Sequence, residues 1–521
     1  MPTTSTTFTS YNVYTNDEGT IAMRCTGYQV YEKQNEEWSL TLSGTANTYV
    51  METMPTVETK FEWQYDTEVL VSAAESDNGS VLNTGFQTYG EECVLTAVAN
   101  DGWHFAGWSG DVPAGKTSDN PLTLMPVEPM TLVPVFLPAG QNRPTQYVST
   151  TGDDANTGLS WESARKTVLE AVSYIRQYEG LDGVVYVDSG TYAWKTPLVL
   201  DFDVSIVGAP RDGGEVILRN TTKQGWNNPD QRVLKINHAK AFVAGVSIEN
   251  GSSGGPGGCV YIQENGGTVS NCVIRGGNSD SHNTDMPHGV GAYLDSADAL
   301  LTHCVVSNCT TALDTWWATG GYLCGIGVDV NKGRVENCLI VDCHGKALPT
   351  YPNTVGGLRV VDGAVVNCTV INCNGSDAGG VRGTADTAFV TNCVAFGNVL
   401  LSPVFEYVDN QNGTITTNTV DAIRMPSGFV GNSAHFVRCA SDAAFPELAE
   451  NSVEGLTSAA FADYAAGDFS PMFEGPLCST GVAIDGWNTQ VDLSGRPRVR
   501  GKIDIGCFEF QPADGMLLLF R

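Results

Sequence analysis

The sequence predicts an all-β chain whose larger part is a solenoid of short parallel strands. Two short patterns recur in alternation through the middle of the 521 residues. In the first, an apolar stretch follows a cysteine, and the repeated cysteines are Cys272, Cys304, Cys338, Cys368 and Cys393. In the second, a pair of glycines precedes a short apolar strand. It begins at residues 257, 289, 325, 356 and 379. Strand-sized units repeated with loops of variable length are typical of a solenoid.

The repeat also predicts which side chains point inward. Each strand of a parallel solenoid stacks about 4.8 Å from its equivalent in the next coil, so alternation turns the five cysteines inward as one column. A second inward column follows two positions later: Ile274, Val306, Ile340, Val370 and Ala395. Buried cysteine packs as a small apolar residue, so we expect thiols, with disulfides between neighbouring coils as the alternative. Asn308, Asp342 and Asn372 are expected to stack at the next turn.

Composition and charge exclude several classes of function. The chain has 58 acidic and 28 basic residues and a formal charge of −30, which repels phosphate backbones and excludes a nucleic-acid-binding protein. No apolar run reaches the ~18 residues of a membrane span. The 58 glycines and the 17% of charged residues suit a turn-rich secreted protein. Residues 1–10 contain no signal segment, so we expect either an intracellular chain or, as the other features favour, a secreted or surface protein whose leader is missing.

The chain is expected to divide into five parts. Residues 1–66 are predicted to form a small β module and 67–137 a second one, with 138–144 as the linker. The solenoid is predicted over 145–480, and 481–521 is predicted to be a C-terminal cap or anchor-associated motif. The oligomeric state is left open.

The second module contains a Gly-x-x-Phe-x-x-Trp-x-Gly-Asp pattern at Gly102, Phe105, Trp108, Gly110 and Asp111. This pattern resembles the small repeat module named after internalin B, which occurs on bacterial surface proteins. We expect the aromatic side chains to fill a small β-core, with stacking on a sugar as the alternative.

The solenoid is expected to begin with a strand, a polar turn and an amphipathic helix. The helix has four apolar residues on one face: Val168, Leu169, Val172 and Ile175. Because the first coil of a solenoid is open, this helix is predicted to cap it.

The segments 147–167 and 184–192, followed by the repeats, resemble secreted bacterial right-handed parallel β-helix proteins. Residues 491–510 resemble the terminal motif of the choice-of-anchor Q proteins of that group. The resemblance covers roughly 145–512 and implies the right-handed parallel β-helix fold. It implies no single activity, because such folds carry lyases, hydrolases, epimerases and adhesins.

Long loops between the cysteine strand and the glycine-pair strand leave the same corner of successive coils, so they share one side of the solenoid. They gather many polar and aromatic residues: Asp280, His282, Asp285, His288, Asp314, Trp316, Trp317, His344, Lys346, Tyr351 and Asp377. An exposed tryptophan beside polar groups suits stacking on a sugar, although partial core packing is the alternative. The predicted substrate-binding residues are Trp316, Trp317, Tyr293, His344, Tyr351 and Asp377.

The strand after each glycine pair is expected to contribute an outward residue to the same side. These residues are Tyr293, Asp329, Arg359 and Arg382, on successive rungs. A surface ladder of ion pairs is the structural alternative. Resemblance to β-helix polysaccharide lyases implies a cation that neutralises a uronate carboxylate and a Lys or Arg base. Neighbouring guanidinium groups depress one another's proton affinity. The predicted catalytic residues are Lys346, Arg359, Arg382 and Asp329.

A cation site is predicted in the loops at Asp280, His282, Asp285 and Asp314, with calcium as the expected ion. The alternative is a solvated loop and no cofactor. A neutral-sugar hydrolase would instead need two carboxylates about 5–9.5 Å apart, which these aspartates and Asp377 could supply.

Two functions follow from the sequence. The first is a secreted or surface-displayed polysaccharide lyase that acts on an acidic glycan by β-elimination. The second is a non-catalytic adhesin or structural glycan-binding protein, favoured by the surface-type module and by the absence of a complete catalytic signature.

Overall fold

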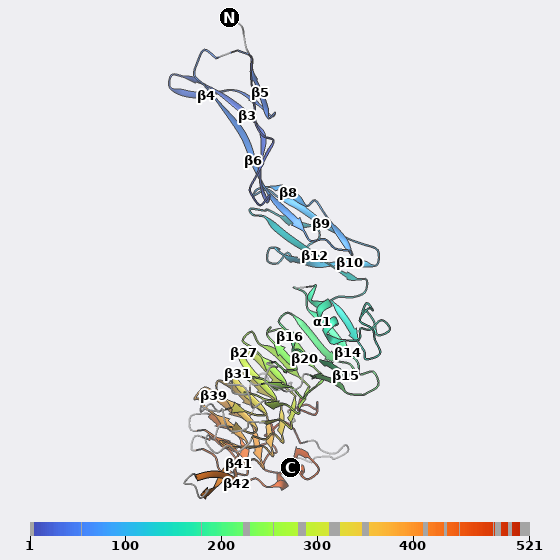
Figure 1. Cartoon of the computed structure of the whole chain (residues 1–521), viewed down its shortest axis with the longest axis vertical. Coiled ribbons are helices and arrows are strands. Elements are labelled where there is room, and N and C mark those ends of the chain that lie inside the picture. Colours follow the sequence, from blue (N-terminus) through green and yellow to red (C-terminus); the bar gives the residue numbers. More distant parts are fainter. Residues whose placement is uncertain are drawn as a thin grey trace, which may run out of the picture. The chain divides into compact units, whose positions relative to one another are not determined.

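The computed structural model describes most of the chain (Figure 1). The described residues are 5–53, 55–178, 180–221, 230–253, 255–279, 288–311, 324–345, 354–409, 415–431, 435–446, 449–482, 484, 491–498 and 503–510. The chain divides into two compact units, residues 1–144 and 145–521.

The first unit is built on a mixed seven-stranded sheet in the order β10-β12-β6-β3-β2, with β4 beside β3 and β8 beside β6. The bounds are β2 Val13–Thr15, β3 Ile21–Gln34, β4 Glu37–Gly44, β6 Thr59–Ala73, β8 Gly85–Thr88, β10 Trp103–Gly110 and β12 Met130–Pro138. The strands β1 (Thr6–Thr9) and β5 (Thr48–Met51) form a separate pair, and β11 (Leu122–Leu124), β9 (Cys93–Ala99) and β7 (Gly79–Leu82) form a third sheet. Strand β6 passes position 66/67 without a break, so one sheet joins the two predicted modules.

The core of the first unit lies between the sheets of residues 69–137. Trp108 is 2% exposed and donates its indole N–H to the carbonyl of Asp119 at 2.7 Å. Phe105 packs on Trp108 with ring centroids 5.1 Å apart. The prediction that these aromatic side chains fill a small β-core is therefore confirmed.

The second unit begins with β13 (Thr145–Val148) and the single α-helix of the described residues, α1 (Val168–Arg176). Thr167 caps the helix, because its hydroxyl accepts the backbone N–H of Glu170. Its buried residues are Val168, Ala171, Val172 and Ile175, which belong to the same apolar core as β14 (Gly183–Val187). The helix predicted as the cap is confirmed, but Leu169 is 38% exposed and Ala171 takes its place. An apolar face read from sequence is wider than the strip that the first coil contacts.

Three rows of parallel strands form the coils that follow. The first row is β16 (Leu198–Leu200), β19 (Leu234–Ile236), β23 (Val260–Ile262), β27 (Ala292–Thr302), β31 (Val328–Glu336), β34 (Leu358–Val360), β38 (Val381–Gly383) and β43 (Phe429–Val430). The second row is β13, β14, β17 (Val204–Gly208), β20 (Phe242–Ala244), β24 (Gly267–Ser270), the second halves of β27 and β31, β35 (Gly363–Val366), β39 (Ala388–Thr391) and β44 (His435–Val437). The predicted parallel β-helix is confirmed by the parallel pairing of these rows.

The third row is a nine-stranded parallel sheet. It comprises β15 (Gly190–Trp194), β18 (Val216–Asn220), β21 (Ser247–Glu249), β25 (Val273–Arg275), β28 (Val305–Ser307), β32 (Leu339–Val341), β36 (Thr369–Ile371), β40 (Val394–Phe396) and β45 (Ala440–Ser441). Shorter ladders lie beside the rows: β22 (Ser252–Ser253), β26 (Asn278–Ser279) and β29 (Thr310–Thr311); β30 (Cys324–Gly325) with β33 (Thr354–Val355); and β37 (Asn374–Gly375) with β41 (Val399–Asp409) and β42 (Ile415–Pro426).

The predicted inward columns are confirmed. The five repeated cysteines are at most 2% exposed and all fifteen cysteines are free thiols. Ile274, Val306, Ile340, Val370 and Ala395 are fully buried beside them. A hydrogen bond also connects neighbouring members of this column, because the backbone N–H of Cys304 donates to Cys338 Sγ at 3.4 Å. Burial raises the pKa of the Cys368 and Cys393 thiols, which disfavours the thiolate form of these two residues.

The turns of the coils use left-handed backbone at recurring positions. Asn308, Asp342 and Asn372 have φ of 52°, 53° and 55°, and asparagine and aspartate tolerate this region better than other non-glycine residues. A second such column precedes the cysteines and includes Asn337 and Asn367, both fully buried.

After β45, Glu450 and Val453 form parallel bridges to Val437 and Ala440, and the described residues from Leu456 on pack along the outer side of the third row. They include η1 (Ser458–Ala460), β46 (Phe461–Asp463) and β47 (Asp468–Pro471). We call residues 456–510 the C-terminal segment. Its apolar residues form a second core with outward residues of the sheet, in which Ile505 and Cys507 meet Ile371, Val394 and Phe396.

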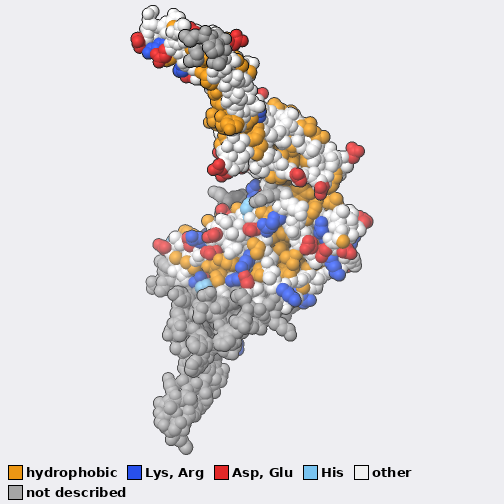
Figure 2. Space-filling view, turned by 45° about the horizontal axis from the view of Figure 1, so that its top comes forward, with side chains coloured by type: hydrophobic (Ala, Val, Ile, Leu, Met, Phe, Trp, Pro, Cys, Tyr) orange, Lys and Arg blue, Asp and Glu red, His pale blue; other side chains and the backbone are white. Residues whose placement is uncertain are grey.

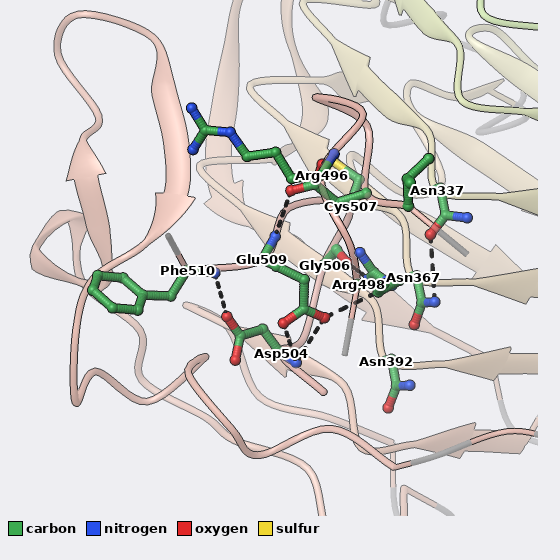
Figure 3. A network of polar contacts seen from close by, with 12 residues as sticks. Asn337, Asn367, Asn392, Arg496, Arg498, Asp504, Gly506, Cys507, Glu509 and Phe510 are labelled. Atoms are coloured by element: carbon green, nitrogen blue, oxygen red, sulfur yellow. Dashed lines mark hydrogen bonds and ion pairs between the residues drawn. The ribbon is translucent and has the colours of Figure 1, made fainter. Parts of the chain in front are cut away.

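Polar contacts at the end of the C-terminal segment complete this packing (Figure 3). The backbone N–H of Cys507 donates to Thr369 Oγ1 at 3.0 Å. Arg498 is fully buried and contacts the carbonyl of Gly506, and its Nε lies 4.0 Å from Glu509 Oε1. The backbone N–H of Asp504 donates to both carboxylate oxygens of Glu509. The described residues of 491–510 thus bury ionisable side chains against the side of the solenoid.

Candidate functional site

The outward residues at the centres of the first-row strands form a continuous ladder. Tyr261 pairs with Tyr293, Tyr293 with Asp329, Asp329 with Arg359, and Arg359 with Arg382. We call these five residues the outer ladder. Their neighbours on either side along each strand, such as Val328 and Val330, belong to the buried core. The predicted register of Asp329, Arg359 and Arg382 on one face is therefore confirmed.

Asp329 differs from the expected exposed rung because its side chain is fully buried. One carboxylate oxygen accepts the Nε–H of Arg359 at 2.9 Å. The other accepts the backbone N–H of Gly325 at 2.9 Å and lies 3.1 Å from Nδ1 of His288. Strand alternation determines the face on which a residue lies but not what covers that face. Here the carboxylate is covered by His288, which precedes β27, and by Gly325, which precedes β31.

His288 is one of the loop residues that the sequence predicts on one side of the solenoid, and the sequence assigns it no role. Its backbone carbonyl accepts the N–H of Gly257 at 2.7 Å, which ties it to the preceding coil. Its ring centroid lies 5.8 Å from that of Tyr293, and its side chain is 21% exposed. The signal available in the sequence was its position just before the glycine pair that precedes β27.

Arg382 has a looser partner than Arg359. Its Nε lies 3.3 Å from Oδ2 of Asp377, and the two side chains are 29% and 22% exposed. Neither of these two atoms makes a hydrogen bond within the described residues. Burial raises the pKa of Asp377, and the Arg382 guanidinium opposes that rise. The predicted residues Arg382 and Asp377 are thus brought together.

Two tyrosines extend the outer ladder toward the first coils. The ring centroids of Tyr261 and Tyr293 lie 5.4 Å apart, and the guanidinium of Arg232 lies 5.6 Å from the Tyr261 ring centroid. Asp230 pairs with Arg232 at 2.8 Å and also with Lys235. Tyr293, predicted to bind substrate, is only 8% exposed, and burial raises the pKa of its hydroxyl. The half-buried Tyr261 therefore offers the more accessible ring.

His344 belongs to a neighbouring ladder rather than to this one. Its backbone forms isolated parallel β-bridges with Thr310 and Asn374, and its Nδ1 lies 2.8 Å from Asn374 Nδ2. In the part of the chain that the structure describes, no contact joins it to Asp329 or Arg359.

Eight predicted site residues lie outside the described residues: Lys346, Trp316, Trp317, Tyr351, Asp280, His282, Asp285 and Asp314. The predicted calcium ligands are all in this group, so the calcium site remains a prediction. Among the residues that are described, no group of three or more His, Cys, Asp or Glu side chains is arranged to hold a metal ion.

Charge is mixed over the visible face of the second unit. Figure 2 shows Lys and Arg side chains interspersed with Asp and Glu over its described surface rather than separated into two patches. Local cationic positions therefore exist on this surface, although the formal charge of the whole chain is −30. Within the described ranges, no helix is long and apolar enough to cross a membrane.

Comparisons with known proteins bear on the two units separately. Residues 69–140 match the family model described as the Divergent InlB B-repeat domain. This finding supports the predicted internalin-B-like module, while the likeness of residues 491–510 to the choice-of-anchor Q motif stays a prediction. No curated protein matches the chain in sequence.

Several solved structures match the chain at low similarity. Pectate lyase Pel9A is 11% identical with a TM-score of 0.37, over 71% of this chain and 97% of its own. A rhamnogalacturonan lyase is 12% identical with a TM-score of 0.28, over 71% of this chain and 97% of its own. Pectin methylesterase PemA from Erwinia chrysanthemi is 12% identical with a TM-score of 0.29, over 60% of this chain and 93% of its own. At these identities and TM-scores the likeness assigns neither an activity nor site residues.

Proposed function

We propose that the protein is a secreted carbohydrate-active β-helix that binds an acidic polysaccharide along the outer ladder and cleaves it by β-elimination. The observation that carries this proposal is the succession of Tyr261, Tyr293, Asp329, Arg359 and Arg382 on adjacent strands of one sheet. Successive residues of this row lie about 4.8 Å apart, and its more accessible aromatic and cationic groups are the half-buried Tyr261 and Arg382, which is 29% exposed.

The two arginines suit the carboxylates of uronate residues. A guanidinium group presents a planar fork of N–H donors that matches a carboxylate, and it stays charged at all working pH values. Arg382 is 29% exposed and its ion pair with Asp377 is incomplete, so it is the cation that a polysaccharide carboxylate would reach first. The Tyr261 ring supplies apolar surface for a sugar face.

A non-catalytic glycan-binding protein is the second candidate, favoured by one observation. Both arginines of the outer ladder already face a carboxylate, Asp329 or Asp377. A guanidinium that faces a carboxylate in this way is already protonated and has no lone pair for a further proton, so the predicted arginine bases would bind rather than catalyse. The test must therefore separate binding from cleavage.

The full chain should be incubated with a panel of uronate polysaccharides, with and without calcium, and the ultraviolet absorbance of unsaturated products followed. Binding to the same polysaccharides should be measured in parallel on a glycan array. Binding with product formation supports the lyase, and binding without product supports the second candidate. The absence of both would overturn the proposed function. Loss of product on adding EDTA would support calcium at Asp280, His282, Asp285 and Asp314.

A further inference from the structure

The hydrogen-bond partners of Asp329 determine which ring nitrogen of His288 carries the hydrogen. The carboxylate of Asp329 accepts the Nε–H of Arg359 and the backbone N–H of Gly325, both at 2.9 Å. Its Oδ2 lies 3.1 Å from Nδ1 of His288. An ionised carboxylate can only accept, so the ring nitrogen that faces it must carry the hydrogen. The neutral ring then has its lone pair on Nε2.

A buried carboxylate behind an imidazole is a recurring way to orient a general base. Asp329 is itself immobilised, because its two other donors come from β30 and β34 and its side chain is fully buried. His288 is 21% exposed, and no described residue bonds its Nε2. The arrangement leaves one lone pair on an oriented ring whose centroid lies 5.8 Å from that of Tyr293 in the outer ladder.

We propose that His288 is the general base of the polysaccharide lyase and that Asp329 is its positioning residue, an inference that rests on the proposed function. Nε2 of His288 removes the C5 proton of a uronate residue. The electron pair of that C–H bond forms the C4–C5 double bond, and the C4–O4 bond breaks. O4 leaves with its electron pair and takes a proton from water. The imidazolium then returns its proton to solvent, so no co-reactant is consumed.

The roles of the other ladder residues follow from this assignment. Arg359 holds Asp329, and Arg382 is left to bind the uronate carboxylate. Both predicted arginine bases thereby become binding or positioning groups. His288 supplies the proton acceptor that the paired arginines lack, because a neutral imidazole carries a lone pair on the ring nitrogen that bears no hydrogen.

The charged and aromatic groups around His288 define the positioning role of Asp329. Among the described residues, Asp329 faces it from β31, Tyr293 from β27 and Arg359 from behind Asp329. Asp329→Asn should lower kcat with little change in KM, because an amide no longer fixes the tautomer that leaves the lone pair on Nε2. Asp329→Glu, which keeps the carboxylate, should recover part of that kcat.

The test compares turnover and binding in the full chain. His288→Ala should lower kcat by about 10²–10⁴-fold with little change in glycan affinity, and added imidazole should restore part of kcat. His435→Ala is the matched control, because this exposed histidine stacks on Phe389 in another row. Circular dichroism of each variant verifies the fold.

The outcomes separate the inference from the proposed function. If the wild type yields unsaturated product and His288→Ala retains its kcat, the inference fails and the lyase function stands. If the wild type binds acidic glycans but yields no product, the lyase function fails and the inference fails with it. Loss of kcat with imidazole rescue and retained binding supports both. If Asp329→Asn does not fold, the rescue of His288→Ala still tests the base.

Discussion

Arg359 and Asp329 are joined across two adjacent strands of the first row by a hydrogen bond of 2.9 Å from Nε to Oδ1. The Asp329 side chain is fully buried and the Arg359 side chain is 12% exposed. This pair therefore differs from a surface ion pair, whose contribution to stability is about 0–1 kcal/mol. Removing one partner of a buried pair leaves an uncompensated charge.

Arg359→Ala should lower the free energy of unfolding by about 3 kcal/mol, because Asp329 would lose its charged partner in a buried position. Arg359→Lys should lose less, since it keeps the charge but not the planar donor. Urea denaturation followed by fluorescence measures both. A loss below about 1 kcal/mol for Arg359→Ala would contradict the burial of the pair.

Arg382→Ala should weaken binding of acidic glycans while lowering the free energy of unfolding by only about 1 kcal/mol. Its ion pair with Asp377 is longer, at 3.3 Å, and both side chains are partly exposed. Isothermal titration with a uronate oligosaccharide measures the affinity. The Arg359 variants serve as comparison on the same ladder. Unchanged affinity would remove Arg382 from the binding face.

Cys338→Ser should lower the free energy of unfolding by about 1–3 kcal/mol, because a hydroxyl is more costly to bury than a thiol and fills less space. Cys338 is fully buried, lies 3.1 Å from the carbonyl of Glu336, and accepts the N–H of Cys304. Cys478→Ser, at a half-buried cysteine, is the control and should change little. Glycan affinity of the folded protein should be unaltered in both.

Glu509→Gln should remove a pH dependence from the packing of the C-terminal segment. Burial raises the pKa of Glu509 from 4.5 to about 8, the Asp504 carboxyl adds to the rise, and Arg498 opposes it. The folded segment therefore holds a proton that the unfolded one releases, so its stability should fall as pH rises from about 4.5 to about 8. Burial likewise raises the pKa of Asp504, with the same sign.

Hydrogen exchange at the amides of Ile505 and Cys507 measures this opening, since they donate to Leu477 and Thr369. Protection in the wild type should decrease between pH 5 and 8 after correction for intrinsic exchange, and Glu509→Gln should flatten the change. Glu474→Gln, at an exposed residue, is the control. An equally steep decrease in Glu509→Gln would assign the dependence to another group.

The repeated part of the fold is predictable because each coil is specified locally. A cysteine and a glycine pair at similar intervals place the inward columns, and strand alternation places Tyr293, Asp329, Arg359 and Arg382 on one outward face. These relations depend only on the order of residues within a coil and on the stacking of equivalent coils. The register of the outer ladder followed from them.

The tertiary structure alone determined what covers those rungs. The sequence predicts Asp329 as an exposed residue of the outer ladder and assigns no role to His288. Their contact joins residues 41 positions apart through a loop whose course no period specifies. The C-terminal segment is a stronger case, because the amide of Cys507 meets Thr369 at a separation of 138 residues. Such contacts arise where irregular segments pack on the sheet, and local periodicity contains no information about the positions of those segments.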